Sequence, residues 1–227
     1  MNLSALVKKY LTRHSGIKNS LIKSRMRLNI LFIKKRMSGR NNRLLYKNTI
    51  LKNVFFDIKG NNNSIVIMDG CNLSNVQFYI CGDNNTIILH NCIKYQSGAF
   101  WTVCNGGHIE IGENTTAENN VSMQIMEDNM KIKVGNDCML SSNISIWTQD
   151  WHKIYDENGN RINNAQDVNI KNHVWIGYDT KILKGVTIGN NNIIGTNTIV
   201  TKSYDDEHII IAGNPGKIVK KGVNWER

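Results

Sequence analysis

The sequence has almost no proline and no long hydrophobic run. A single proline among 227 residues suits a backbone built from continuous β-ladders, which proline interrupts. No run approaches the roughly 18 apolar residues of a transmembrane helix, and the apolar stretch Asn29 to Ile33 is too short for a signal peptide. Five cysteines without CxxC spacing argue against a disulfide scaffold and for reduced thiols. These absences predict a soluble or peripheral protein located in the cytoplasm.

Acidic residues are also absent from the first 47 positions, which hold thirteen Lys and Arg. The remaining residues carry fifteen bases against eighteen acids, so the net charge of +10 comes from a basic N-terminal arm. Within the arm, one apolar stripe has helical spacing: Leu3, Leu6, Val7, Tyr10 and Leu11. Residues 1–48 are therefore predicted to be a basic, amphipathic helical segment.

Two roles for this arm stay open. It can lie on the inner membrane surface, where basic residues are attracted to anionic lipids. Alternatively, it can pack on the first coil or on a neighbouring subunit and so shield the open end of the repeat array. Nucleic acid is not an expected partner, because the arm has few interleaved aromatic residues and no recognised binding motif.

The stretch IKNHVWIGYDTKILKGVTIGNNNIIGTNTIV, residues 170–200, has an aliphatic residue at every sixth position: Ile170, Ile176, Ile182, Ile188, Ile194 and Val200. A period of six fits neither an α-helix nor an ordinary strand. It fits a triangular parallel β-coil of 18 residues per turn, with each aliphatic side chain pointing inward. Glycine after the inward residue suits a sharp bend, as at Gly135, Gly177, Gly189 and Gly195, and the abundant Asn tolerates left-handed backbone.

An internal repeat extends the coil towards the N-terminus. Residues 51–67 (LKNVFFDIKGNNNSIVI) align with residues 73–89 (LSNVQFYICGDNNTIIL) at nine of seventeen positions. Each unit is too short to bury an apolar face alone, so the units must stack. The sequence thus predicts an all-β solenoid over residues 49–204, followed by a tail over residues 205–227.

The hexads VGNDCM, IKNHVW, IGYDTK, ILKGVT and IGNNNI resemble the repeats of the left-handed parallel β-helix acyltransferases. The ending VTK followed by IIIAGNPGKIVKK resembles the maltose, serine and xenobiotic acetyltransferase branch, and the overall pattern resembles the capsular sialic-acid O-acetyltransferases. This resemblance implies acetyl-CoA as co-substrate, a homotrimer, and a sugar hydroxyl of a capsular or other surface polysaccharide as acceptor.

The aliphatic period is interrupted once. Val134, Leu140 and Ile146 keep the period, which returns only at Ile170, so residues 147–169 are predicted to form a projecting loop. A concentration of aromatic and titratable residues in such a loop is typical of a functional site. The resemblance assigns catalysis to His152, since a neutral imidazole can remove the proton of an attacking hydroxyl; a surface histidine is the alternative. Asp150 either orients this imidazole or is simply solvated, and the acceptor is expected to contact Trp147, Trp151 and Tyr155.

The resemblance also implies roles for residues after the loop. Trp175 corresponds to a tryptophan that works with the histidine, and an aromatic residue that packs the coil edge is the alternative. Contacts with the pantetheine arm and phosphates of CoA are expected at Tyr178, Thr196, Thr201, Lys202, Lys217 and Lys220, for which a merely charged coil surface is the alternative. Lys153, Arg161, Lys171 and Lys181 would suit an acidic acceptor.

Three other functions compete with this hypothesis. A β-helical carbonic anhydrase needs closely spaced zinc histidines, whereas His152 and His173 lie 21 residues apart, so no metal is expected. A non-catalytic scaffold leaves the loop and the VTK and AGNP segments unexplained. An acetyltransferase that modifies a small molecule or a nucleotide-linked sugar remains open.

Overall fold

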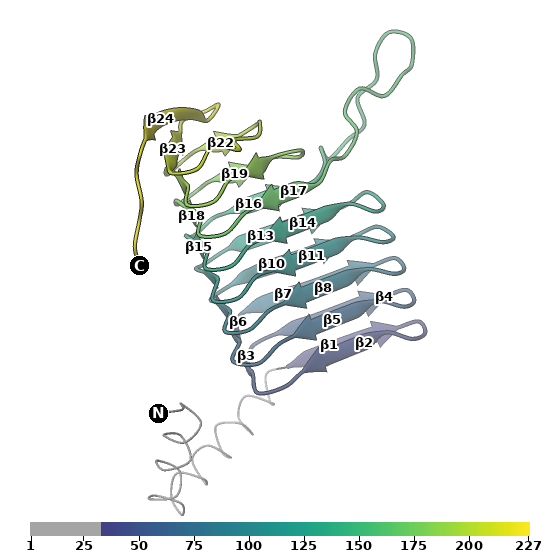
Figure 1. Ribbon diagram of the computed structural model, residues 1–227. Helices are drawn as coiled ribbons and strands as arrows, with labels where there is room; N and C mark the ends of the chain where they lie inside the picture. Colours follow the sequence, from purple (N-terminus) through teal and green to yellow (C-terminus); the bar gives the residue numbers. More distant parts are fainter. Residues whose placement is uncertain (1–32) are drawn as a thin grey trace, which may run out of the picture.

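The computed structural model describes residues 33–227, and all regular secondary structure in this range is β. The chain winds into a left-handed parallel β-helix of about eight turns, as the sequence predicts (Figure 1). Within residues 33–227 no helix has the length and apolarity needed to cross a membrane. The amphipathic helix predicted near the N-terminus lies outside the described residues, and both of its possible roles stay predictions.

Each complete turn contributes one strand to each of three sheets, here called sheets A, B and C. Every strand pair is parallel except β23 with β24. Sheet A contains β1 (Lys34–Ser38), β4 (Phe55–Lys59), β7 (Val76–Cys81), β10 (Gly98–Thr102), β13 (Val121–Ile125), β16 (Ser145–Trp147), β19 (Lys181–Ile182) and β22 (Ile199–Val200). Sheet B contains β2 (Arg43–Tyr46), β5 (Ser64–Ile67), β8 (Thr86–Leu89), β11 (His108–Ile111), β14 (Lys131–Val134), β17 (Val168–Ile170) and β20 (Thr187–Ile188). Sheet C contains β3 (Ile50–Lys52), β6 (Asn72–Ser74), β9 (Lys94–Tyr95), β12 (Thr116–Ala117), β15 (Met139–Leu140), β18 (Trp175–Ile176), β21 (Ile193–Ile194), β23 (Ile209–Ala212) and β24 (Lys217–Lys221).

The core consists of columns of similar side chains stacked along the coil axis. All six residues of the predicted six-residue period are fully buried. The 22-residue repeat is equally visible, because Phe56 pairs in register with Phe78 and their rings stack at 4.9 Å between centroids. Phe78 in turn stacks on Phe100 at 4.9 Å. The repeat therefore places identical side chains on top of one another, which is how units too small to fold alone share one core.

Asparagine rather than glycine supplies the left-handed backbone at many of the corners. Asn114, Asn143 and Asn191 have φ near 60°, a conformation that the short Asn amide tolerates. Gly135 is not at positive φ; a Cβ there would lie 2.6 Å from the carbonyl carbon of Lys171 on the next turn. Glycine is therefore required at position 135 because two turns approach closely there. The prediction that Gly135 relieves a sharp bend is corrected accordingly.

The coil begins earlier than the predicted boundary at residue 49. Strand β1 already pairs with β4, and β2 pairs with β5, so residues 34–48 belong to the coil and not to the helical arm. The reason is that every residue of β1 is exposed. Among the described residues, this first turn has a neighbouring turn on one side only, so its sequence need not show the alternation from which strands are predicted.

Candidate active site

The predicted loop leaves the coil between β16 and β17 and projects far from it (Figure 1). Its neck is closed by a hydrogen bond of 2.8 Å from the Gln166 amide to the Thr148 carbonyl. Further out, Tyr155 and Arg161 form an antiparallel bridge. The loop is therefore an ordered hairpin-like excursion, consistent with the loss of period over residues 147–169.

Asn163 organises the base of this loop. It is buried, with 7% of its surface exposed, and its side chain bonds three separate points. The amide nitrogen Nδ2 donates to Asp150 Oδ2 at 2.9 Å and to the His152 carbonyl at 2.8 Å, while Oδ1 accepts from the Ile154 amide at 2.7 Å. One residue thereby fixes the backbone at His152 and Ile154 and the side chain of Asp150.

Two ion pairs attach the loop to the coil. Arg161 makes a two-pronged contact with Glu127 on the preceding turn, and this hydrogen bonding lowers the pKa of the Glu127 carboxyl. Lys184 on the following turn donates to Asp150 Oδ2 at 2.6 Å, which is the main reason that the pKa of Asp150 is lowered. Arg161 is consequently neutralised by Glu127 and is less suited to an acidic acceptor than its sequence position suggests.

His152, Trp151 and Tyr155 lie at the surface of the loop, whereas Trp147, also predicted to contact the acceptor, is half-buried at the end of β16. His152 is exposed, and Trp151 and Tyr155 are exposed by 52% and 56%. No hydrogen bond joins the His152 imidazole to Asp150 among the described residues; Asp150 Oδ2 accepts instead from Asn163 and Lys184. In this conformation Asp150 therefore braces the loop and does not orient the imidazole.

Trp175 lies on sheet C, on the side of the coil away from the projecting loop (Figure 1). Its indole Nε1 is buried and has no hydrogen-bond partner among residues 33–227. Trp225, from the segment after β24, packs against it with a centroid separation of 6.2 Å. The described chain thus holds an unused N–H donor beside an aromatic cluster, on a different side from His152.

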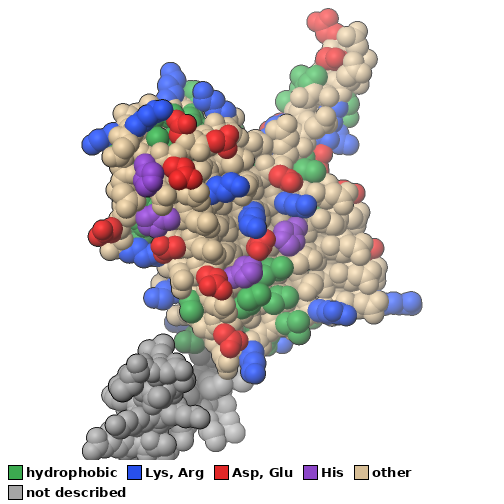
Figure 2. Space-filling model, in the orientation of Figure 1, with side chains coloured by type: hydrophobic (Ala, Val, Ile, Leu, Met, Phe, Trp, Pro, Cys, Tyr) green, Lys and Arg blue, Asp and Glu red, His purple; other side chains and the backbone are tan. Residues whose placement is uncertain are grey.

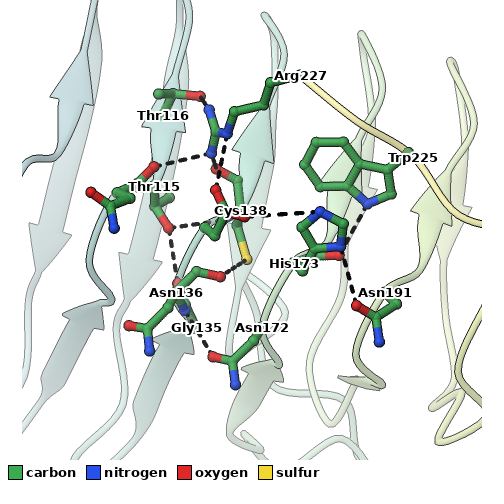
Figure 3. A network of polar contacts seen from close by, with 12 residues as sticks. Thr115, Thr116, Gly135, Asn136, Cys138, Asn172, His173, Asn191, Trp225 and Arg227 are labelled. Atoms are coloured by element: carbon green, nitrogen blue, oxygen red, sulfur yellow. Dashed lines mark hydrogen bonds and ion pairs between the residues drawn. The ribbon is translucent and has the colours of Figure 1, made fainter.

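The end of the chain runs back down sheet C and is tied to several turns (Figure 3). Trp225 stacks on His173 at 4.2 Å and donates its Nε1–H to the His173 carbonyl at 3.0 Å. Arg227 reaches lower turns, where it donates to Asp137 Oδ1, Thr116 Oγ1 and the carbonyls of Asn114 and Cys138. This segment, residues 225–227, is called the C-terminal clip below.

The residues expected to contact CoA fall into two groups. Tyr178 and Thr196 follow β18 and β21 at the corner between sheets C and A, and the Tyr178 hydroxyl accepts a 2.8 Å bond from Asn143. Thr201 and Lys202 follow β22 at the same edge of sheet A from which the loop departs.

Lys217 and Lys220 lie on β24 at the upper end of the coil, where Lys and Arg side chains gather in Figure 2. Both are exposed and make no ion pair within the described residues, whereas Lys221 pairs with Asp206 at 2.8 Å. Two lysines are therefore available for an anionic ligand. Within residues 33–227, no group of three His, Cys, Asp or Glu side chains is placed to hold a metal ion.

Sequence reasoning missed Asn163 and the C-terminal clip. A buried asparagine inside an irregular loop gives no periodic signal, and its partners are known only once the loop is folded. A Trp and an Arg close together in a polar tail were a weak hint of a docked segment, since aromatic and Arg side chains often anchor interfaces.

Comparison with known proteins places the chain among acetyltransferases. Residues 167–202 match the family "Bacterial transferase hexapeptide (six repeats)". The chain is 37% identical over 191 residues to the polysialic acid O-acetyltransferase of Neisseria meningitidis, an alignment that covers 83% of this chain and 87% of that protein.

Two further similarities differ in how much they cover. The polysialic acid O-acetyltransferase of Escherichia coli O1:K1 / APEC is 33% identical over 123 residues, which is 54% of this chain but only 39% of that relative. The crystal structure of the polySia-specific acetyltransferase NeuO superposes with a TM-score of 0.77 at 30% identity, covering 86% of this chain and 89% of that one.

A left-handed coil of hexapeptide repeats with one projecting loop, together with these similarities, defines an acetyltransferase of the hexapeptide-repeat class. Within that class, the chain belongs to the family that contains the polysialic acid O-acetyltransferases. The fold and the family expected from the hexads and from the AGNP segment are both confirmed.

Proposed function

We propose that this enzyme transfers an acetyl group from acetyl-CoA to a hydroxyl group of an acidic surface polysaccharide, with polysialic acid as the first candidate. The observation that carries the proposal is the 37% identity to a polysialic acid O-acetyltransferase over most of both chains. The exposed aromatic residues of the loop, Trp151 and Tyr155, suit a large acceptor that approaches from solvent.

In the proposed reaction, His152 acts as the general base. Its neutral imidazole takes the proton from the acceptor hydroxyl while the hydroxyl oxygen attacks the thioester carbonyl. A new C–O bond forms, the C–S bond breaks, and the CoA thiolate leaves and takes up a proton. The products are the O-acetyl sugar and free CoA. Asn163 serves this step by holding the backbone at His152 and Ile154, and positioning of this kind contributes strongly to rate.

The proposed site is completed by a second copy of the chain. Within one copy, His152 projects on the loop and Trp175 lies on sheet C on another side of the coil. A homotrimer with its coils side by side would bring the loop of one copy to sheet C of the next, where the unpaired Trp175 Nε1–H can donate to the thioester carbonyl oxygen. CoA would lie between the coils, with Lys217 and Lys220 near its phosphates.

The test is acetyl-CoA turnover by the wild-type enzyme and by His152→Ala, with polysialic acid, neutral glycans and free sialic acid as acceptors. We expect transfer to the polymer, and a loss of roughly 10²-fold or more in kcat for His152→Ala, the usual scale for a positioned general base. Glu157→Ala, at an exposed position of the same loop, is the matched control and should keep most of the activity.

Two results would overturn these assignments. Near-normal turnover by His152→Ala would remove the assigned base. Transfer only to small sugars or nucleotide-linked sugars would replace the polysaccharide acceptor. Separately, light scattering should give the mass of three chains, and a stable monomer that is fully active would refute a site shared between copies.

A further inference from the structure

Sheet A carries a continuous row of side chains on its outer surface that ends at the base of the loop. The strand register places these positions directly above one another, one per turn, and we call them the outward row: Asp57, Tyr79, Trp101, Gln124 and Trp147. Strands in a sheet are about 4.8 Å apart, so the row is about 19 Å long. Trp147 is the last residue of β16, and the loop begins directly after it. The row therefore runs along the coil axis to the point where the candidate catalytic loop starts.

The outward row concentrates polar atoms that have no partner. Seven side-chain nitrogen or oxygen atoms within residues 33–227 are buried without a hydrogen bond, and four of them belong to this row. They are Oδ1 of Asp57, Nε1 of Trp101, Oε1 of Gln124 and Nε1 of Trp147. A buried polar group left unpaired costs roughly 1–3 kcal/mol. Along the row, acceptors and donors are interleaved, and the rings that carry the donors remain partly exposed.

The neighbouring positions leave these rings accessible. On β7, β10, β13 and β16 the adjacent outward column has small or flexible side chains, Gln77, Ala99, Ser122 and Ser145, whereas β4 has Phe55 at this position. The rings of Tyr79 and Trp101, whose centroids are 6.0 Å apart, therefore project beyond the smaller side chains of the adjacent column. Such a strip of aromatic faces next to small polar groups is suited to the alternating C–H and hydroxyl faces of sugar rings.

The charge of this surface favours an anionic ligand. Outward positions on the strands of sheet A carry four basic residues, Lys34, Arg36, Lys59 and Lys181, and one acidic residue, Asp57. Asp57 is paired with Arg36 at 3.5 Å, and Lys59 lies over the ring of Tyr79 at 5.5 Å. Lys181 pairs with Asp179 at 3.6 Å, so the excess of positive charge near this row comes from Lys34 and Lys59.

We propose that the outward row is a binding track for the acceptor polymer, on which successive sugars of one acidic polysaccharide chain lie before and after the sugar that is acetylated. This inference rests on the proposed polysaccharide acceptor and extends it to residues far from the loop. A second copy of the chain is the competing occupant. Sugar hydroxyls both donate and accept, so one polymer can satisfy Trp101 Nε1–H and Gln124 Oε1 alike after a small rotation of the ring.

The experiment compares long polysialic acid with a short sialic acid oligomer, using Trp101→Ala, Trp101→Phe and the control Ile88→Ala. Ile88 is also half-buried and faces outward, but on sheet B. Trp101→Ala should raise the KM for the long polymer about tenfold, the scale of one aromatic anchor, with little change in kcat or in the KM for acetyl-CoA. The short oligomer, which cannot reach both the loop and Trp101, should be unaffected. Trp101→Phe keeps a ring and should recover part of the loss.

Direct binding separates this inference from the proposed function. Affinity for the long polymer is measured without acetyl-CoA, so the result does not depend on catalysis. Weaker polymer binding by Trp101→Ala, but not by Ile88→Ala, supports the track even if the acetylated hydroxyl lies on another sugar. Unchanged polymer binding by both Trp101 variants overturns the track and leaves the acetyltransferase proposal standing. A change in the mass of the oligomer for Trp101→Phe, with unaltered polymer affinity, would assign the row to a contact between copies.

Discussion

The C-terminal clip offers the sharpest test of how the parts of the site are held in place. Trp225 is 94% buried, since 6% of its surface is exposed, and it contacts both His173 and Trp175. Replacing Trp225 by alanine removes the stacking on His173, the packing on Trp175 and the hydrogen bond to the His173 carbonyl. We expect the Trp225→Ala clip to detach from sheet C.

The expected magnitude follows from the buried ring. An aromatic side chain buries about 150–250 Å², and at about 25 cal/mol per Å² this is worth about 4–6 kcal/mol as an upper limit. Measured Trp-to-Ala losses of about 3–5 kcal/mol agree with that range. Arg227 alone is a poor substitute, because three of its four contacts lie at the exposed surface, where an ion pair contributes about 0–1 kcal/mol. The loss stays local, since turns of a solenoid depend mainly on their neighbours.

Hydrogen exchange measures this detachment at the last backbone hydrogen bond before the clip. The Val223 amide donates to the His208 carbonyl at 3.1 Å and should exchange roughly 10² to 10³ times faster in Trp225→Ala, because each 1.4 kcal/mol is a factor of ten. Amides in β13 and β14 should keep their protection. Glu226→Ala, at the exposed neighbouring position, is the matched control. A Trp225→Ala clip that stays as protected as the wild type would refute the calculation, and a lower kcat accompanying detachment would show that the clip positions Trp175.

Three further predictions concern the loop and the coil. Because hydrogen bonding from Lys184 lowers the pKa of Asp150, this contact stabilises the loop above the ordinary Asp pKa of about 3.9 and is lost as the pH falls through the lowered value. An NMR titration should show Lys184→Met raising the pKa of Asp150, with Lys153→Met as control. Asn163→Ala should increase exchange at the Ile154 amide and lower kcat, whereas intact exchange would deny Asn163 its bracing role. Gly135→Ala should destabilise the coil by roughly 1–3 kcal/mol in denaturant unfolding, the cost of overpacking; Gly216→Ala, where the nearest atoms are side-chain methyl groups at 3.1 Å, should cost less.

The coil could be predicted because its signal is periodic and local. Ile170 pairs in register with Ile188, and Phe56 pairs in register with Phe78. Both pairs point inward for the same reason: every turn has the same length between corners, so the same position of each repeat faces the core. The projecting loop could be predicted from the same regularity, since an interruption is visible only against a strict period. The beginning of the coil could not, because β1 is exposed at every position and only its pairing with β4 identifies it as a strand.

The internal contacts of the site could not be predicted from the sequence. Asp150 and His152 are two residues apart, and this short separation alone suggested a hydrogen bond between their side chains. In the folded loop, Asp150 instead accepts hydrogen bonds from Asn163 and Lys184. His152 and Trp175 are 23 residues apart, and proximity in a family motif suggested that they meet. In one chain these two residues lie on different sides of a rigid coil, so a contact between them depends on how copies of the chain assemble. A single sequence carries no direct signal of that assembly.

The two ends of the coil explain why its basic residues are hard to assign to one role. A parallel coil leaves an unpaired strand edge at each end, and such edges invite further strands to add unless charge prevents it. Both ends here are lysine-rich: β1 begins with Lys34, Lys35 and Arg36, and β24 ends sheet C with Lys217 and Lys220 exposed. The lysines proposed to attract CoA phosphates are therefore also placed to prevent end-to-end association. A change of charge sign, as in Lys217→Glu, keeps the edge charged while repelling phosphate. If that variant loses CoA affinity without aggregating, the loss is consequently due to a cofactor-binding role of Lys217 and not to its position at the edge of the coil.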